Sequence, residues 1–196
     1  MIFDLITIVV VAAMLLFAGF TVLQFLGRFP RRTSDDVTPY LRPAEFEELE
    51  ALLDPGQEVS FRLRLSPREF RSWQRKRIHL MREYLLRMSH NSLVLIEWGN
   101  MELIAQENSV SPSQEVRDLA QELVQAGTEF RLYSFLALAK LKLWILFRLD
   151  LSASLPTLRK LFGIDSLDSY RRLKSAAGAL GMSHGHDYNQ VLLSRL

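Results

Sequence analysis

The fold of this protein is decided by residues 66–98, SPREFRSWQRKRIHLMREYLLRMSHNSLVLIEW. The stretch opens with Ser66-Pro67-Arg68-Glu69, a capping-box pattern with proline at the first helical position. Apolar residues then recur at helical spacing, namely Phe70, Trp73, Met81, Tyr84, Leu85, Met88, Leu95 and Ile96. The pattern predicts one long helix, in which Asn91 and Gly99-Asn100 are the weakest positions. Residues 93–96 also fit a buried strand, but we favour the helix.

A second start signal lies at Ser111-Pro112-Ser113-Gln114 and precedes another long apolar pattern that runs to Ile145. The polar turn at 108–111 predicts that the two long helices form an antiparallel hairpin. Shorter helices are predicted at 43–53, 156–162 and 167–180, followed by a short closing element or a loose tail at 188–196. The chain is therefore expected to be mainly α, with a soluble helical-bundle domain built on the hairpin.

Residues 58–66 have a different pattern. Val59, Phe61, Leu63 and Leu65 alternate with polar residues. A period of two is typical of an extended segment with one buried face, and Asp54-Pro55-Gly56 before it reads as the stop of the helix at 43–53. We therefore expect a short strand at 58–66.

The N-terminal region predicts a membrane anchor. Residues 5–26 carry no charge, and as a helix they would reach about 33 Å, enough to cross a bilayer core. A signal peptide is the alternative, but no Lys or Arg precedes the run. Asp4 lies before it, and Arg28, Arg31 and Arg32 follow it, so the positive-inside rule places the amino terminus outside and the rest in the cytoplasm of the cell. The expected parts are an anchor at 1–27, a linker at 28–42 and a cytoplasmic helical domain at 43–196.

Composition and motifs argue against an enzyme. The chain has 196 residues, a net charge of +2 and no cysteine, which excludes disulfides, thiolate zinc sites and a cysteine nucleophile. It contains no GxSxG, HExxH, Walker or dinucleotide-binding motif. Only His184-Gly185-His186-Asp187 resembles a set of metal ligands, and its spacing favours a polar turn. We expect no cofactor, and a metal-dependent enzyme at these residues is the second alternative function.

A basic segment is the first candidate binding surface. Residues 62–87 hold nine basic and two acidic residues, whereas residues 43–58 hold six acidic residues and no base. The two segments can neutralise each other, or the bases can form a binding face. The anionic inner leaflet is the favoured target because the anchor is close, and the near-neutral total charge counts against nucleic acid. The candidate face consists of Arg68, Arg71, Arg75, Lys76, Arg77 and Arg82.

A second candidate surface is the apolar segment at 132–151. Lys140 and Lys142 near its middle argue against a second membrane span. A core helix with outward lysines is the favoured interpretation, followed by an interfacial helix and a surface for an integral partner. The candidate partner-facing residues are Phe130, Phe135, Leu141, Trp144 and Phe147.

Together these features predict a single-pass interaction protein of the cell membrane. Its expected role is that of a scaffold, adaptor or accessory subunit of a membrane-associated complex, with a protein partner and possible contact with anionic lipid. The first alternative is a membrane-tethered protein that binds nucleic acid or anionic lipid through the helix at 68–87. The sequence does not determine the oligomeric state or the partner.

Overall fold

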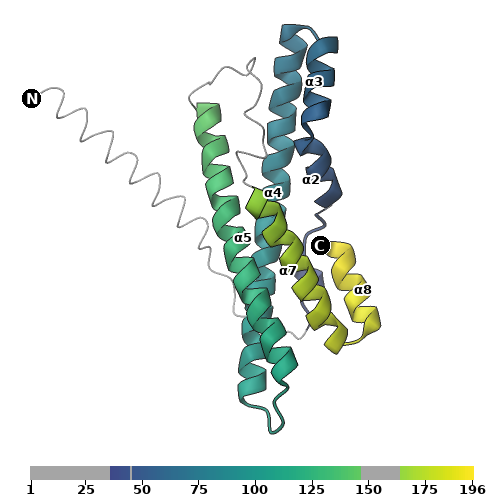
Figure 1. Ribbon diagram of the computed structural model, residues 1–196, viewed down its shortest axis with the longest axis vertical. Helices are drawn as coiled ribbons and strands as arrows, with labels where there is room; N and C mark the ends of the chain where they lie inside the picture. The colour runs from purple at the N-terminus through teal and green to yellow at the C-terminus, as the bar shows by residue number, and fades with distance from the viewer. Residues whose placement is uncertain (1–35, 45, 147–163) are drawn as a thin grey trace, which may run out of the picture. The chain divides into compact units, whose positions relative to one another are not determined.

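A computed structural model describes residues 36–44, 46–146 and 164–196 of the chain. These residues are mainly helical and contain no β-strand, which confirms the predicted α class (Figure 1). The elements are η1 (Thr38–Tyr40), α2 (Phe46–Leu53), α3 (Pro55–Arg64), α4 (Pro67–Glu107), α5 (Gln114–Leu146), α7 (Ile164–Ser183) and α8 (His186–Arg195).

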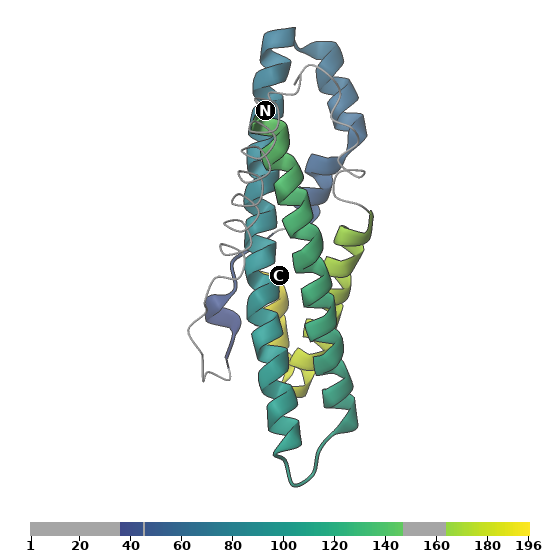
Figure 2. The same ribbon diagram turned by 90° about the vertical axis from the view of Figure 1, so that its left-hand side faces the viewer.

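The long hairpin forms as predicted, with α4 and α5 side by side in both views (Figures 1 and 2). The capping box is present, since the Glu69 backbone amide donates to Ser66 Oγ at 3.4 Å and the Ser66 amide donates to Glu69 Oε2 at 2.9 Å. The hydrogen bonds from Ser66 also lower the pKa of the Glu69 carboxyl. Helix α4 continues through Asn91 and Gly99, so the predicted weak points do not break it.

Two glycines allow α4 and α5 to approach each other closely. A Cβ atom on Gly127 of α5 would lie 2.6 Å from Ile96 Cγ1, and a Cβ on Gly99 of α4 would lie 3.1 Å from the backbone oxygen of Ala120. Neither position has room for a side chain without displacement of the neighbouring helix. Gly99 is thus required by the packing of the hairpin, which explains why a poor helix former occurs within α4.

Helices α7 and α8 complete the described core. Helix α7 packs against α5 and α8 packs against α7. The Tyr170 ring of α7 lies 4.9 Å from the Phe130 ring of α5, and the Tyr170 hydroxyl donates to the backbone oxygen of Leu196 at 3.2 Å. The helix predicted at 167–180 therefore exists with longer bounds, and the predicted closing element at the C-terminal end is the helix α8.

The expected strand at 58–66 is wrong, because residues 55–64 form the helix α3. Asp54 is the N-cap of this helix, since its side chain accepts a hydrogen bond from the Gly56 amide at 2.9 Å, and Pro55 begins the first turn. The residues read as a stop signal are therefore a start signal. Alternation alone does not make a strand without a partner to accept its hydrogen bonds, and Leu63 is 82% exposed rather than buried on one face.

Some predictions lie outside the described residues, namely the membrane span at 5–26, the first part of the linker at 28–35 and the helix at 156–162. Across the ranges that are described, no helix combines the length and the apolar character that a membrane span needs.

The described part of the apolar segment at 132–151 lies in α5, where Ala137, Leu138 and Leu141 are buried while Lys140 is exposed. This is the core arrangement that the sequence favoured.

Candidate binding surface on helix α4

Four arginines line up along the first half of α4. Arg68, Arg71, Arg75 and Arg82 are separated by three, four and seven residues, a spacing that keeps them on one face of a helix with 3.6 residues per turn. The first three are exposed and Arg82 is partly exposed, and the exposed Lys76 lies beside them. We call these five residues the basic stripe.

The basic stripe has no acidic partner in the described part of the chain. Ion pairs between described residues join other groups, and the nearest one on the same face is the exposed pair between His79 Nε2 and Glu83 Oε1, at 3.4 Å. Like charges three and four residues apart on a helix repel each other, as Arg68, Arg71 and Arg75 do. The stripe is therefore a concentrated positive surface that has no ion pair with any described residue.

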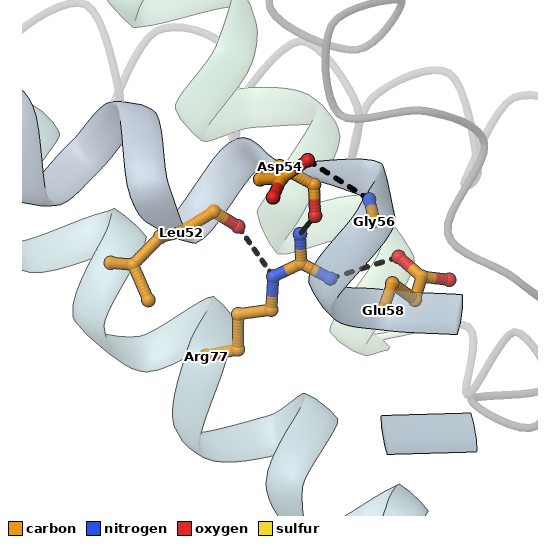
Figure 3. A network of polar contacts seen from close by, with 5 residues as sticks. All are labelled: Leu52, Asp54, Gly56, Glu58 and Arg77. Atoms are coloured by element: carbon orange, nitrogen blue, oxygen red, sulfur yellow. Dashed lines mark hydrogen bonds and ion pairs between the residues drawn. The ribbon is translucent and has the colours of Figure 1, made fainter. Parts of the chain in front are cut away.

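Arg77 does not belong to this surface, although the sequence predicted it there. Its side chain is buried and its Nη1 atom donates to Glu58 Oε2 at 2.8 Å (Figure 3). The guanidinium also donates to the backbone oxygens of Leu52 and Asp54 and lies 5.1 Å from the Trp73 ring. Burial lowers the pKa of Arg77, and the hydrogen bond and charge of Glu58 oppose this shift. Arg77 thus joins α2 and α3 to α4.

Each of the two interpretations of the charge segregation, mutual neutralisation and a free basic face, applies to a different part of the basic segment. The acidic segment at 43–58 does neutralise part of the basic segment, through the pair of Glu58 and Arg77. The residues of the basic stripe take no part in that neutralisation. One turn before Arg77, Gln74 is fully buried, and neither its Nε2 nor its Oε1 atom has a hydrogen-bond partner.

Of the five residues of the predicted apolar partner surface, three have described side chains, and two of these three belong to the core. Phe130 is buried against Tyr170 of α7, Leu141 is also buried, and Phe135 is partly buried. The Trp144 side chain and Phe147 lie outside the description. The exposed large apolar residues of α5 are Leu132 and Leu136 instead, at 58% and 46% exposure. Periodicity alone could not show which apolar residues α7 would cover.

The predicted metal cluster is divided between two roles. His184 Nε2 pairs with Glu102 Oε1 at 3.1 Å, and its ring lies 5.6 Å from that of Trp98. Trp98 Nε1 donates to the same Glu102 oxygen at 3.1 Å. His186 contacts Gln190 on the surface. Nowhere in the described ranges do three or more His, Cys, Asp or Glu side chains gather as metal ligands. His184 instead attaches the turn between α7 and α8 to Glu102 and Trp98 of α4.

A polar attachment that the sequence did not reveal lies further along α4. The side chain of Asn91 accepts a hydrogen bond from the Arg42 amide at 2.8 Å and donates to the Arg42 oxygen at 2.7 Å. His90 Nε2 lies 3.1 Å from the backbone oxygen of Tyr40, and the Val37 amide donates to the Tyr188 hydroxyl at 3.5 Å. Residues 36–42, the second part of the predicted linker, are thereby fixed to the bundle, and Figure 2 shows η1 beside α4.

The sequence held one signal for this attachment. Asn91 lies within the apolar pattern of α4, between Met88 and Leu95, and a buried amide needs hydrogen-bond partners. The sequence pattern predicts a weak point of the helix at Asn91, whereas in the structure its side chain binds the backbone of Arg42. The same buried amide forms a hydrogen bond with Tyr170, whose pKa is raised chiefly by burial and lowered by this bond.

Comparison with known proteins adds no family to this description: neither the protein-family models nor the curated proteins nor the solved structures contain a match to the chain. The functional argument therefore depends on the residues of this chain and on their geometry.

Proposed function

We propose that this chain is a single-pass membrane-anchored interaction protein that acts as a scaffold, adaptor or accessory subunit of a membrane-associated complex. Its anchor is the uncharged segment at 5–26, and the arginines after it place the bundle on the cytoplasmic side. The mechanism is tethering, which raises the effective concentration of the bundle at the membrane. The proposal contains no catalytic step.

One observation carries the proposal, namely the basic stripe. The five cations are accessible and have no acidic partner among the described residues. Their mutual repulsion costs the isolated helix about 0.2–0.5 kcal/mol for each like-charged pair. An anionic partner reverses the sign of this term, because it replaces repulsion with charge-assisted hydrogen bonds to guanidinium groups. The stripe is thus supported as the surface through which the bundle binds.

The test is affinity purification of the tagged full-length protein from its native membranes in mild detergent, followed by mass spectrometry. A stripe variant carries Arg68→Glu, Arg71→Glu and Arg75→Glu. A matched control carries the same number of reversals at exposed and scattered positions, Arg87→Glu, Arg117→Glu and Arg195→Glu.

We expect a stoichiometric partner to copurify with the wild type and the control and to be lost from the stripe variant. Recovery of the same partner with all three proteins would contradict the role of the stripe. Protease treatment of right-side-out vesicles tests the topology, since the bundle should be fully protected. Digestion of the bundle in intact vesicles would overturn the proposed orientation.

A further inference from the structure

We propose that two copies of this chain associate through the open face of the α4–α5 hairpin, with their α4 helices antiparallel. The basic stripe of each copy then lies against acidic residues of the other copy. The inference deepens the proposed function and rests on it, since it takes the stripe as the binding surface and names a second copy of the chain as what the stripe contacts.

The first step identifies the open face. Trp98 of α4 packs against the turn between α7 and α8. Glu107 lies nine residues later, about two and a half turns, and therefore on the opposite side of α4. On α5, Phe130 contacts Tyr170 of α7, while Leu132 points about half a turn away from Phe130. Figure 2 shows α4 and α5 in front of α7 and α8, so neither of these two helices covers the open face.

Three exposed leucines form an apolar centre on the open face. The register of the hairpin is fixed where Gly127 of α5 meets Ile96 of α4. One leucine lies ten residues before Ile96 and another lies nine residues after Gly127, so the two are level with each other in the antiparallel hairpin. The leucine of α4 also lies one turn after Arg82 of the stripe. The three are Leu86, Leu132 and Leu136, which are 43%, 58% and 46% exposed.

The open face is basic at one end and acidic at the other. Arg71 and Glu107 are 36 residues apart, about ten turns, and so lie on one side of α4. Arg82 and Glu97 are 15 residues apart, about four turns, and lie close to the same side. Glu107 is exposed and Glu97 is partly exposed, and neither forms an ion pair with a residue that the structure describes. Residues 97–129 as a whole hold seven acidic residues and one basic residue.

The leucines set the position of a two-fold axis. When Leu132 of one copy faces Leu136 of an antiparallel second copy, the axis passes Ser134, midway between them. Ser134 of α5 and Ser89 of α4 are level with each other, because each lies seven residues from the close contact between the two helices. The axis that joins the leucines therefore crosses α4 at Ser89.

The same axis pairs the charges. Ser89 is the midpoint between Arg71 and Glu107, and the midpoint between Arg82 and Glu97 falls between positions 89 and 90. Each of these arginines therefore meets a carboxylate of the second copy, and the symmetry forms each pair twice. Guanidinium and carboxylate groups form charge-assisted hydrogen bonds that can be bidentate. The leucine centre and both charge pairs thus require one and the same axis.

Other partners of the stripe match this face less well. A surface of phosphates, in a bilayer or a nucleic acid, would attract its basic end and repel its acidic end. A parallel arrangement of two copies would place the arginines of both stripes against each other. An antiparallel second copy matches both ends of the face and covers the leucines between them.

Reversal of the charges at each end provides the test, in the full-length protein in mild detergent. The basic-end variant carries Arg71→Glu and Arg82→Glu, and the acidic-end variant carries Glu97→Arg and Glu107→Arg. Each protein is coexpressed with two different tags, and the copurification of one tagged copy with the other measures association. Circular dichroism of each variant confirms that the helices are intact.

We expect the wild type to associate, and also a control with Arg87→Glu and Arg195→Glu, two exposed positions outside the open face. The association constant of each reversal variant with itself should fall at least about tenfold. A variant with all four reversals should associate with itself but not with the wild type, because its pairs are restored with the signs exchanged. Failure of this rescue would overturn the inference, and so would a wild type that does not associate.

The direction of the pair is tested by electron paramagnetic resonance. The chain has no cysteine, so Ser72→Cys gives a single site for a nitroxide label. Ser72 lies 17 residues before Ser89, and the two labels of an antiparallel pair are therefore 34 residues apart along the helices, about 51 Å. A parallel pair would bring the labels next to each other, and a short distance would overturn the inference.

Failure of the proposed function has a different signature. If a different protein copurifies through the stripe while the two tagged copies stay apart, the proposed function stands and the inference is wrong. If the copies associate as expected and no other protein is recovered, the inference stands and the role in a larger complex is wrong. If neither association depends on the stripe, both proposals are wrong.

Discussion

The two halves of α4 use the same helix for different purposes. In residues 88–107, polar and small residues serve packing, since Asn91 has its amide fully paired and Gly99 lets α5 approach. In residues 67–87, exposed arginines have no acidic partner among the described residues, and the amide of the buried Gln74 has no hydrogen-bond partner there. The comparison teaches that the second half is committed to the fold, whereas the first half exposes arginines that no acidic residue of the described ranges neutralises.

The largest expected effect tests the buried arginine of the first half, Arg77, whose charge is paired within the fold. Glu58→Ala should destabilise the protein by about 3–5 kcal/mol, because it leaves the buried Arg77 guanidinium without its counter-charge. The free energy of unfolding is measured by urea titration of the full-length protein in detergent. The double variant Glu58→Met with Arg77→Met should recover most of the loss, and a double variant as unstable as the single one would show that the ion pair is not the cause.

The next effect tests the packing of the second half. Gly127→Ala should destabilise by about 1–3 kcal/mol, because its Cβ would lie 2.6 Å from Ile96 Cγ1 and the hairpin would have to separate. Gly178→Ala is the matched control, since its Cβ would meet the flexible end of Leu193 at 3.3 Å and Asn189 Oδ1 at 3.7 Å, without a contact shorter than 3 Å. Thermal unfolding of both variants measures the difference. Equal stability of the two would mean that α4 and α5 do not approach as closely as described.

The unpaired amide of the first half predicts a gain in stability. Gln74→Leu should stabilise the protein by about 1–3 kcal/mol, because a buried polar group without a partner is replaced by an apolar one of similar size. Gln121→Leu, at an exposed position of α5, should change the free energy of unfolding by less than about 0.5 kcal/mol. Loss of stability in the Gln74 variant would show that its amide has a polar role.

A pH effect probes the burial of the Tyr170 hydroxyl. Burial raises the pKa of the Tyr170 hydroxyl above its ordinary value of 10.0, so the folded state holds this proton more tightly than the unfolded state. The stabilisation is fully present below pH 10 and is lost as the pH rises above it. By pH 11, one unit above the unfolded pKa, about 1.4 kcal/mol of this stabilisation has been lost.

Urea titrations at pH 9 and pH 11 measure this loss. Tyr170→Phe should remove that part of the pH dependence, and Tyr40→Phe, at a position 37% exposed, should leave it unchanged. Identical pH dependence of the wild type and Tyr170→Phe would contradict the burial of the hydroxyl.

The smallest expected effect on stability comes from the stripe arginines, and it tests the difference between the two halves of α4 most directly. Replacement of Arg68, Arg71 and Arg75 by Gln should stabilise the protein by about 0.4–1 kcal/mol, because it removes two like-charged pairs that each cost about 0.2–0.5 kcal/mol. The same variant should lose the partner that copurifies with the wild type. If it unfolds much more readily than the wild type in urea titration, the stripe serves the fold and the division of α4 into two halves is wrong.

Local signals in the sequence were sufficient for much of the fold. The capping box at Ser66, the polar turn before Gln114 and the helical spacing of apolar residues predicted the hairpin, because each acts over a few residues of one chain segment. The strand at 58–66 failed because a period of two also occurs on a short exposed helix, and only the cap at Asp54 separates the two.

The candidate surface was predicted in part. The sequence identified the basic residues, and the structure removed Arg77 from the surface while leaving the five residues of the stripe exposed or partly exposed. It also transferred Phe130 and Leu141 from a partner surface to the core. Neither correction was available from spacing, because burial depends on which distant segment covers a face.

By itself the sequence determined the helical class, the hairpin, the charge segregation and the uncharged segment at 5–26, since all of these are properties of composition and local period. Only the tertiary structure decided that Glu58 would neutralise Arg77 and no member of the stripe, and that Asn91 would clamp residue 42. These contacts join residues 19 and 49 positions apart, and the burial of each polar group makes its partner obligatory. Such pairings depend on how the helices pack, which no local pattern specifies.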